Sequence, residues 1–222
     1  MAIRTRRHCV ILAPTAHWLM IVDHYRTPAE PADAEIKVDR SRFLGFVIPL
    51  ASEEQFNAEL GALSKRFFDA THLCWAWRIA GDGTPRERSS DAGEPHGTAG
   101  KPILSAIEGA DLFDLAVIVV RFYGGVKLGT GGLSRAYRAA AQAAIAEAPL
   151  ADRYLYTRFE IAVPFSQLNL IYRMVAPPAV VLVRETFGER NLFQLDVRRS
   201  EAEQFAMGLK NLEFRIQNSE SE

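Results

Sequence analysis

The chain has 222 residues, of which 48% are hydrophobic and 24% charged, and its 26 Lys and Arg nearly balance its 27 Asp and Glu. This balance is typical of folded globular proteins and excludes a disordered chain, a fibrous repeat and a protein that is basic throughout. The longest nearly apolar runs, 115–120 and 174–183, are far shorter than the roughly 20 residues of a membrane span. We therefore expect a cytoplasmic protein without membrane partners.

Residues 1–19 are predicted to be an extension outside the fold. Three arginines precede the apolar stretch 9–13, which resembles the start of a signal peptide, but the stretch is shorter than the usual 7 to 15 residues. We interpret Met20 as an alternative start, directly before the first patterned segment. Cys9 and Cys74 form no CxxC pair, so neither a disulfide framework nor a zinc site is expected.

The first part of the chain alternates strand and helix patterns. Ser52 and Gln55 form a capping box at the start of one helix. Hydrophobic periodicity predicts, in chain order, a strand over 35–50, a helix after Ser52, a strand over 71–79, a helix over 101–110, a buried strand over 112–122 and a helix over 133–145.

The strand 71–79 has a clear two-residue period. The alternation places Trp75 and Trp77 toward the core, and His72 and Arg78 together on the other face.

A domain boundary is expected near residue 150. Thirteen of the 15 glycines precede it, and Pro149 ends a helical pattern. Beyond it, the predicted elements are a strand over 156–163, a helix over 167–175, strands over 180–187 and 192–197, a helix opened by Ser200 and Glu203, and a possible last strand over 214–217. The order βαββα with a possible final β is that of the ferredoxin-like fold. We therefore predict an α+β protein with domains over 20–149 and 152–222.

Ten glycines fall in two windows, 81–100 and 124–132, which we call the first and second glycine loops. The first loop ends in Gly100-Lys101, but Pro95 and Pro102 stand where a phosphate-binding P-loop needs Gly and Ser or Thr. Asp91, Glu94 and His96 in this loop admit an acid/base or metal interpretation as well as a turn-forming one. We favour the turn-forming role.

The second glycine loop leads from the buried strand into a helix. Between Asp114 and Glu147 no acidic residue occurs, and four cations stand there: Arg121, Lys127, Arg135 and Arg138. Exposed N–H groups at a helix start favour an anion. The pattern therefore supports an anion or partner site about as well as a tight turn with solvated arginines.

His72 and Cys74 lie two residues apart on one strand face. This pair is compatible with a catalytic base and nucleophile, but a buried Cys beside a hydrogen-bonded His is the commoner situation, and we favour it.

Four segments together resemble the Impact/YigZ family over residues 20–148. They are 41–43, 69–76, 90–104 and 121–137. The surface implied by the family motifs comprises Thr71, His72, Asp91, Glu94 and Thr98, together with Arg78 just beyond the second segment. The resemblance implies a first domain of the ribosomal protein S5 domain 2 type. It also implies a C-terminal domain that is similar to an elongation-factor module.

The resemblance further implies a role linked to translation, since eukaryotic relatives restrain the amino-acid-starvation kinase pathway and bacterial members are suspected nucleic-acid binders. We therefore predict a non-enzymatic, cofactor-free protein that binds RNA or a ribosome-associated partner. Lys101, Arg121, Lys127 and Arg135 would contact phosphates and Tyr123 would stack on a base. Alanine at Arg121 should then weaken binding with little loss of stability.

Two alternatives remain open. One is an enzyme acting on a small phosphorylated or acidic substrate, with Asp91 or Glu94 as base, His72 as acid, and Lys101 or Lys127 holding the anion. It requires both glycine loops to converge on one pocket. The other is a protein-interaction module, which predicts an exposed apolar patch beside the loops.

Overall fold

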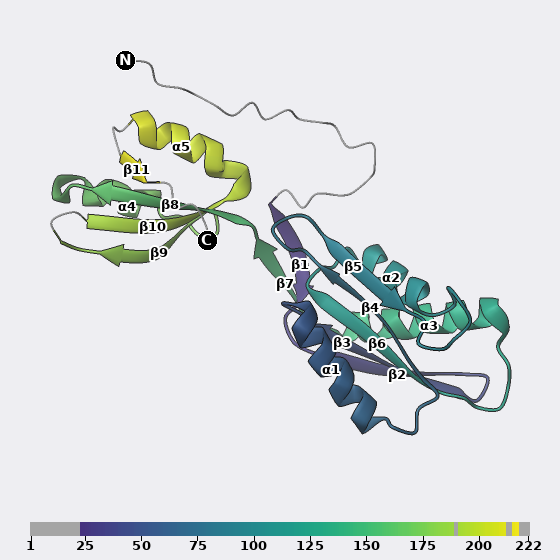
Figure 1. The fold of residues 1–222 in the computed structure, drawn as a ribbon. Coiled ribbons are helices and arrows are strands. Elements are labelled where there is room, and N and C mark those ends of the chain that lie inside the picture. Colours follow the sequence, from purple (N-terminus) through teal and green to yellow (C-terminus); the bar gives the residue numbers. More distant parts are fainter. Residues whose placement is uncertain (1–22, 189–190, 212–214, 218–222) are drawn as a thin grey trace, which may run out of the picture.

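A five-stranded antiparallel sheet forms the centre of the first domain (Figure 1). The computed structural model describes residues 23–188, 191–211 and 215–217, to which all structural statements refer. In sheet order the strands are β2 (Ala32–Val38), β3 (Ser41–Pro49), β6 (Leu115–Phe122), β4 (His72–Ile79) and β5 (Arg86–Ser90). The predicted extension over 1–19, with Cys9, and Met20 lie outside the described residues.

The single strand predicted over 35–50 is wrong, because this segment contains most of β2 and all of β3. Asp39 and Arg40 have φ angles of 43° and 66° and turn the chain between them. The left-handed region is uncommon for residues other than glycine, although Asp is enriched there. The sequence did not predict this hairpin because its turn contains neither Gly nor Pro, the residues that most clearly indicate a turn.

Helices cover both faces of this sheet. On one face lies α1 (Glu53–Arg66), whose Phe56 and Leu63 pack in one core cluster with Trp77. The predicted capping of this helix is confirmed, since Gln55 N donates to Ser52 Oγ at 3.3 Å. The other face holds α2 (Gly100–Gly109) and α3 (Gly129–Glu147).

Both faces of β4 are part of the hydrophobic core: Trp77 packs on the α1 side, and the other face packs on the side of α2 and α3. Cys74 and Ala76 have no exposed surface and belong to the cluster formed with α2 and α3. The predicted burial of β6 on both faces is confirmed, because Leu115–Val120 is buried throughout. A sheet covered on both faces explains the lack of alternation in β6.

A two-stranded ribbon lies at the junction of the two domains. It pairs β1 (His24–Pro28) with β7 (Leu150–Tyr154), neither of which the sequence pattern predicted. Contacts also cross the junction: Arg198 donates to the Asp23 carboxylate, and Ser200 N donates to the same carboxylate at 3.1 Å. The predicted boundary at 149–152 therefore falls at the start of a strand that pairs with the first domain's N-terminal segment.

The ribbon makes the extent of the first domain testable. We expect residues 20–155 to form a soluble, cooperatively unfolding domain, and residues 20–149 to be less stable by about 2 kcal/mol or more. The shorter fragment loses β7 and Leu155, which packs with Phe113 and Ala80. Urea unfolding followed by circular dichroism measures the difference. Equal stability of the two fragments would mean that the ribbon contributes nothing to the first domain.

The second domain has the βαββαβ order of the ferredoxin-like fold, and the predicted α+β class is confirmed. Its elements are β8 (Tyr156–Val163), the 3-10 turn η1 (Phe165–Gln167), α4 (Leu168–Met174), β9 (Val180–Thr186), β10 (Asn191–Arg198), the 3-10 turn η2 (Arg199–Glu201), α5 (Ala202–Asn211) and β11 (Arg215–Gln217). The sheet order is β11-β8-β10-β9, and every neighbouring pair is antiparallel. Ile161, Phe193 and Leu195 are fully buried at its centre. In the described part of the chain, no helix has the length and apolarity to cross a membrane.

Candidate functional site

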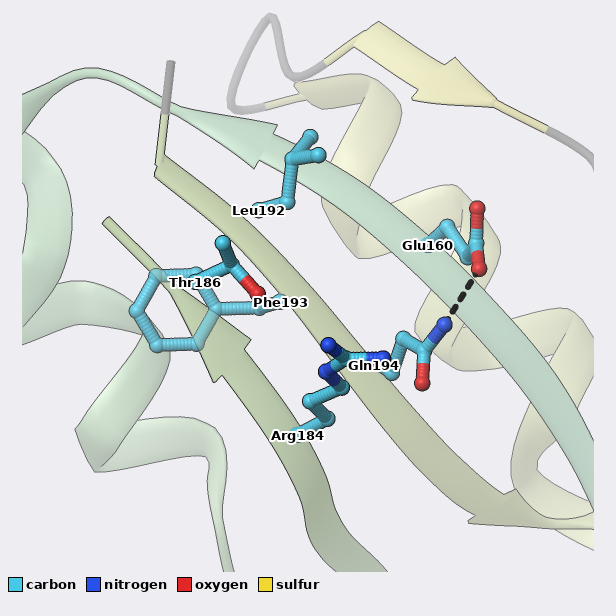
Figure 2. A pocket seen from close by; sticks show the side chains of 6 residues that line it. All are labelled: Glu160, Arg184, Thr186, Leu192, Phe193 and Gln194. Carbon is cyan, nitrogen blue, oxygen red and sulfur yellow. Dashed lines mark hydrogen bonds between the residues drawn. The ribbon is translucent and has the colours of Figure 1, made fainter. Parts of the chain in front are cut away.

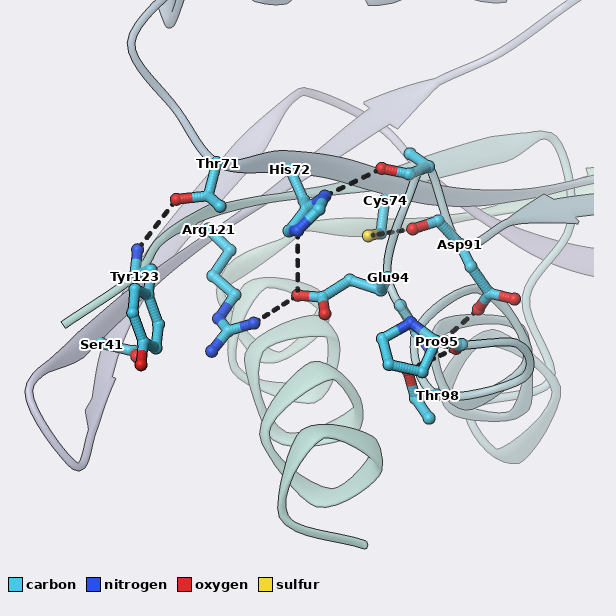
Figure 3. Close-up of polar contacts among 12 residues, drawn as sticks. Ser41, Thr71, His72, Cys74, Asp91, Glu94, Pro95, Thr98, Arg121 and Tyr123 are labelled. Atoms are coloured by element: carbon cyan, nitrogen blue, oxygen red, sulfur yellow. Dashed lines mark hydrogen bonds and ion pairs between the residues drawn. The ribbon is translucent and has the colours of Figure 1, made fainter. Parts of the chain in front are cut away.

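The two glycine loops converge on one cavity of about 390 Å³ at the end of the first domain's sheet. The first loop contributes Glu94 and Pro95. The end of β6, the second loop and the start of α3 contribute the remaining lining residues: Arg121, Tyr123, Lys127, Leu128, Gly129, Thr130 and Leu133. Figure 3 shows Glu94, Pro95, Arg121 and Tyr123 of this lining together with neighbouring polar residues. The two glycine loops therefore meet at one pocket, which is the arrangement that the enzyme alternative requires.

The second loop is held against the neighbouring strands by its backbone. Gly124 lies so close to Arg40 that a Cβ built on it would be 2.1 Å from the Arg40 carbonyl carbon. Gly124 N donates to Ser41 Oγ at 3.2 Å, and Tyr123 N donates to Thr71 Oγ1 at 3.0 Å. Thr71, one of the family-motif residues, therefore helps to hold the chain at the start of the second loop.

Arg121, which the sequence predicts to contact phosphates, is not an exposed cation. The residue is 5% exposed, and its Nη1 donates to Glu94 Oε1 at 2.5 Å (Figure 3). Tyr137 Oη, from α3, donates to the same oxygen at 2.8 Å. The side chain points under the loop because a buried carboxylate from the first glycine loop balances its charge. Tyr137 was predicted only as a core residue, because a tyrosine on an apolar helix stripe gives no sign of its hydroxyl partner.

His72 and Cys74 lie beside this buried pair. His72 Nε2 is 4.0 Å from Glu94 Oε1, and its Nδ1 lies 3.0 Å from the Ala92 carbonyl oxygen. Cys74 Sγ donates to the Asp91 carbonyl oxygen at 2.9 Å, and burial raises the pKa of this thiol to about 12. Because a neutral thiol is a poor nucleophile, Cys74 is a packing residue rather than a catalytic one.

Asp91 holds the first glycine loop in shape. Its carboxylate accepts backbone N–H groups of Gly97, Ala99 and Gly100 at 2.7, 3.0 and 2.8 Å. Burial opposes its ionisation, but these three donors outweigh burial and hold the pKa of Asp91 below its ordinary value. The possible role of Asp91 as a general base is therefore wrong, since both its oxygens are engaged in capping the start of α2.

Four other predicted residues lie outside the cavity lining. Lys101 is exposed in the first turn of α2, and Arg135 is exposed on α3. Arg78, near the opposite end of β4, lies 3.5 Å from Glu87 and over the ring of Phe113. Thr98 is buried and donates to the Pro95 carbonyl oxygen at 2.7 Å. Thr98 and Arg78 therefore have local structural partners.

The possible metal-ligand role of Asp91, Glu94 and His96 lacks a suitable geometry. Asp91 and Glu94 have different partners, and His96 Nδ1 is 3.8 Å from Asp91 alone. Within the described ranges, no three His, Cys, Asp or Glu side chains are placed to hold a metal ion.

A second, smaller hollow of about 220 Å³ lies on the sheet of the second domain (Figure 2). Gln194 Nε2 donates to Glu160 Oε1 there at 2.6 Å, and Phe193 forms part of the lining. Its polar groups are thus partly engaged with one another. Of these two, the cavity lined by both glycine loops is larger and has more residues from the family motifs.

The capping role of Asp91 leads to a prediction about pH. Asp91→Ala should lower the free energy of unfolding at pH 7 by about 1–3 kcal/mol, because three backbone donors lose their acceptor. Folding lowers this pKa, so the ionised carboxylate stabilises the protein above its ordinary pKa of 3.8, and the contribution is lost as pH falls through the lower folded-state value. The variant should therefore lose less stability than the parent protein between pH 5 and pH 2.

Denaturant unfolding at a series of pH values tests this prediction. Glu108→Ala, which removes an exposed carboxylate from α2, is the matched control and should leave the pH dependence close to that of the parent protein. Identical acid profiles for Asp91→Ala and the parent protein would contradict the capping role.

Comparison with known proteins places this chain in the IMPACT family. Residues 39–145 match the Impact N-terminal domain. An IMPACT family member from Thermus thermophilus is 44% identical over 62% of this chain and 73% of its own length. IMPACT family member YigZ from Escherichia coli is 32% identical over 67% of this chain and 73% of its own length. The chain belongs to this family, and the predicted resemblance is confirmed.

The full architecture also has a solved counterpart. A crystal structure described as that of a hypothetical protein covers 90% of this chain and 99% of its own, with 26% identity and a TM-score of 0.62. The two-domain arrangement therefore occurs in a relative of matching length.

Proposed function

We propose that this protein is a cytoplasmic, translation-linked regulator that binds RNA or a ribosome-associated partner through the loop face. This name denotes four exposed residues that lie in the first half of α2, between β6 and α3, and in the first half of α3: Lys101, Tyr123, Lys127 and Arg135. Membership of the IMPACT family supports the translation-linked part of the proposal.

The free cations of the loop face carry the binding part of the proposal. Lys101, Lys127 and Arg135 are exposed, and among the described residues none has a carboxylate oxygen within ion-pair distance. Exposed cations without carboxylate partners attract phosphate groups, and they do so even on a protein whose net charge is −1.

Tyr123 adds a surface on which a base can stack. Its side chain is 46% exposed at the mouth of the cavity. The buried Arg121 guanidinium lies 5.5 Å from its ring centre and supports the ring from beneath. An aromatic ring between cations is the arrangement by which proteins bind single-stranded nucleic acid without strict sequence preference.

Binding to single-stranded RNA and to purified ribosomes, measured at several salt concentrations, tests the proposal. Lys127→Ala and Arg135→Ala should each weaken binding and reduce the slope of log affinity against log salt by about 0.7. Arg173→Ala is the matched control, because Arg173 is exposed on α4 in the other domain. If all three variants bind as the parent protein does, or if the parent protein shows no salt-sensitive binding at micromolar concentration, the proposal is wrong.

A second candidate function is an enzyme acting on a small phosphorylated or acidic substrate. The observation in its favour is that Glu94, Arg121 and Lys127 line one cavity, with the His72 imidazole 4.0 Å from Glu94. Turnover of phosphorylated small molecules that is abolished in His72→Gln, with folding retained, would support it. The engagement of Glu94 Oε1 by two donors makes it the weaker candidate.

A further inference from the structure

The cavity that both glycine loops line exposes an almost entirely apolar surface. Pro95, Leu128 and Leu133 belong to its walls. Leu133 is a member of the core cluster between the sheet and the helices α2 and α3, and Leu128 packs against that cluster, so the cavity is continuous with the core of the first domain. Glu94 and Arg121 also belong to the lining, but their charged groups are paired with each other. The walls of the cavity therefore suit an apolar group.

Apolar surface continues outside the cavity along the second glycine loop. Tyr123 at the mouth and Val126 further along the loop are both exposed. A ligand that filled only the cavity would leave these side chains in water. An exposed apolar patch around a pocket is typical of a protein interaction site, in which one side chain of the partner enters the pocket and its neighbours cover the rim. This is the patch that the interaction-module alternative requires.

The rim of the cavity is positively charged. Lys127 lines the mouth, and Arg135 Nη1 lies 3.4 Å from the position that a Cβ on Gly131 would occupy in the first turn of α3. Among the described residues, neither cation has a carboxylate oxygen within ion-pair distance. No acidic residue occurs between Asp114 and Glu147, so the second loop carries cations alone. Acidic residues beside an apolar anchor complement this rim, whereas the same rim on a second copy would repel it.

The lining favours an amino-acid side chain over a nucleotide. A base edge and a phosphate both need hydrogen-bond partners, which an apolar wall does not provide. An aromatic side chain such as that of Phe buries about 150–250 Å² of surface and needs no such partner. The cavity volume of about 390 Å³ falls in the range of roughly 300–1,000 Å³ that small-molecule sites occupy, and it leaves room for such a ring.

We propose that this cavity receives an aromatic side chain from an acidic segment of a ribosome-associated protein. The ring packs on Pro95, Leu128 and Leu133, and the acidic residues on either side of it meet Lys127 and Arg135. An aromatic anchor in a pocket contributes most of the binding energy of such an interface, and the charges around it favour association with the correct partner. This inference rests on the proposed function, because it chooses a protein rather than RNA as the partner that the loop face binds.

The test uses short peptides that differ in two respects. The central residue is Phe, Leu or Ala, and all flanking residues are Glu, Gln or Lys. Fluorescence anisotropy measures the affinity of each peptide for the full chain. We expect the peptide with a central Phe and Glu flanks to bind about tenfold more tightly than its Ala-centred counterpart and about tenfold more tightly than its Lys-flanked counterpart. It should also compete with purified ribosomes for the protein.

One variant tests the pocket. Thr130 lines the cavity and is exposed, so Thr130→Trp places a large side chain at the mouth with little effect on the melting temperature. We expect this variant to lose the preference for a central Phe over Ala. Thr130→Ser, the matched control, should keep it.

A second variant tests the rim and does not depend on the first. Lys127→Glu combined with Arg135→Glu should reverse the preference for flanking charge, so that the Lys-flanked peptide binds more tightly than the Glu-flanked one. Arg173→Glu combined with Arg184→Glu changes the net charge equally at two exposed positions of the other domain. This control should keep the preference of the parent protein.

The outcomes separate the inference from the proposed function. Ribosome binding without a preference for Phe over Ala, or with a preference that Thr130→Trp leaves intact, would overturn the inference and keep the proposed function. RNA binding or self-association that Thr130→Trp abolishes, in place of peptide binding, would assign the cavity to RNA or to a second copy and overturn the inference. The expected peptide preferences without binding of ribosomes or RNA would keep the acidic, aromatic partner and overturn the proposed function. Binding of none of these ligands would overturn both.

Discussion

Arg121→Ala is expected to lower the free energy of unfolding by about 3–5 kcal/mol, although Arg121 belongs to a loop region rich in surface cations. The substitution leaves the Glu94 carboxylate, 8% exposed, without the guanidinium that compensates its charge. Tyr137 Oη alone then remains as a donor to this carboxylate at hydrogen-bond distance. Removing one member of a buried ion pair is costly because the other charge stays out of water.

Chemical unfolding of the full chain measures this effect, with Arg135→Ala as the matched control. Arg135 is an exposed arginine 14 positions further along, and its loss should change stability by no more than about 0.5 kcal/mol. The double variant Arg121→Leu with Glu94→Leu should recover part of the loss, since it removes both charges. A stability change below about 1 kcal/mol in Arg121→Ala would contradict the importance of this buried ion pair.

The second large effect concerns two glycines of the same loop, for which we expect opposite signs. Gly124→Ala should destabilise the first domain by about 1–3 kcal/mol, because its Cβ would lie 2.1 Å from the backbone of Arg40. Backbone atoms cannot move aside as a flexible side chain can, so the start of β3 must shift.

Gly131→Ala should instead stabilise the protein by about 0.4–1 kcal/mol. Gly131 lies in the first turn of α3, its φ is not in the left-handed region, and the nearest atom to a built Cβ is Arg135 Nη1 at 3.4 Å. The alanine lowers the entropy of the unfolded chain without a clash. Melting temperatures of the two variants and the parent protein test whether the two substitutions change stability in opposite directions. A destabilised Gly131→Ala would show that this glycine, too, is required by the architecture.

The sequence alone determined those elements that depend on interactions between residues close together in the chain. The capping box at Ser52, the uninterrupted apolar run of β6 and the βαββαβ order of the second domain all follow from local pattern, because caps, burial and periodicity act within a few residues. The motifs in four segments of the first domain likewise predicted the family, which the comparison with known proteins confirmed.

Only the tertiary structure revealed the features that depend on contacts between residues far apart in the sequence. The pairing of β1 with β7 joins segments more than 120 residues apart, and neither strand has a strong pattern of its own. Arg121 and Glu94 are separated by 27 residues, and each by itself reads as a solvated charge. Their burial depends on the first glycine loop folding over the end of β6, which no local pattern encodes. The sequence thus selected the candidate residues, and only the fold decided which of them are buried together and which are exposed.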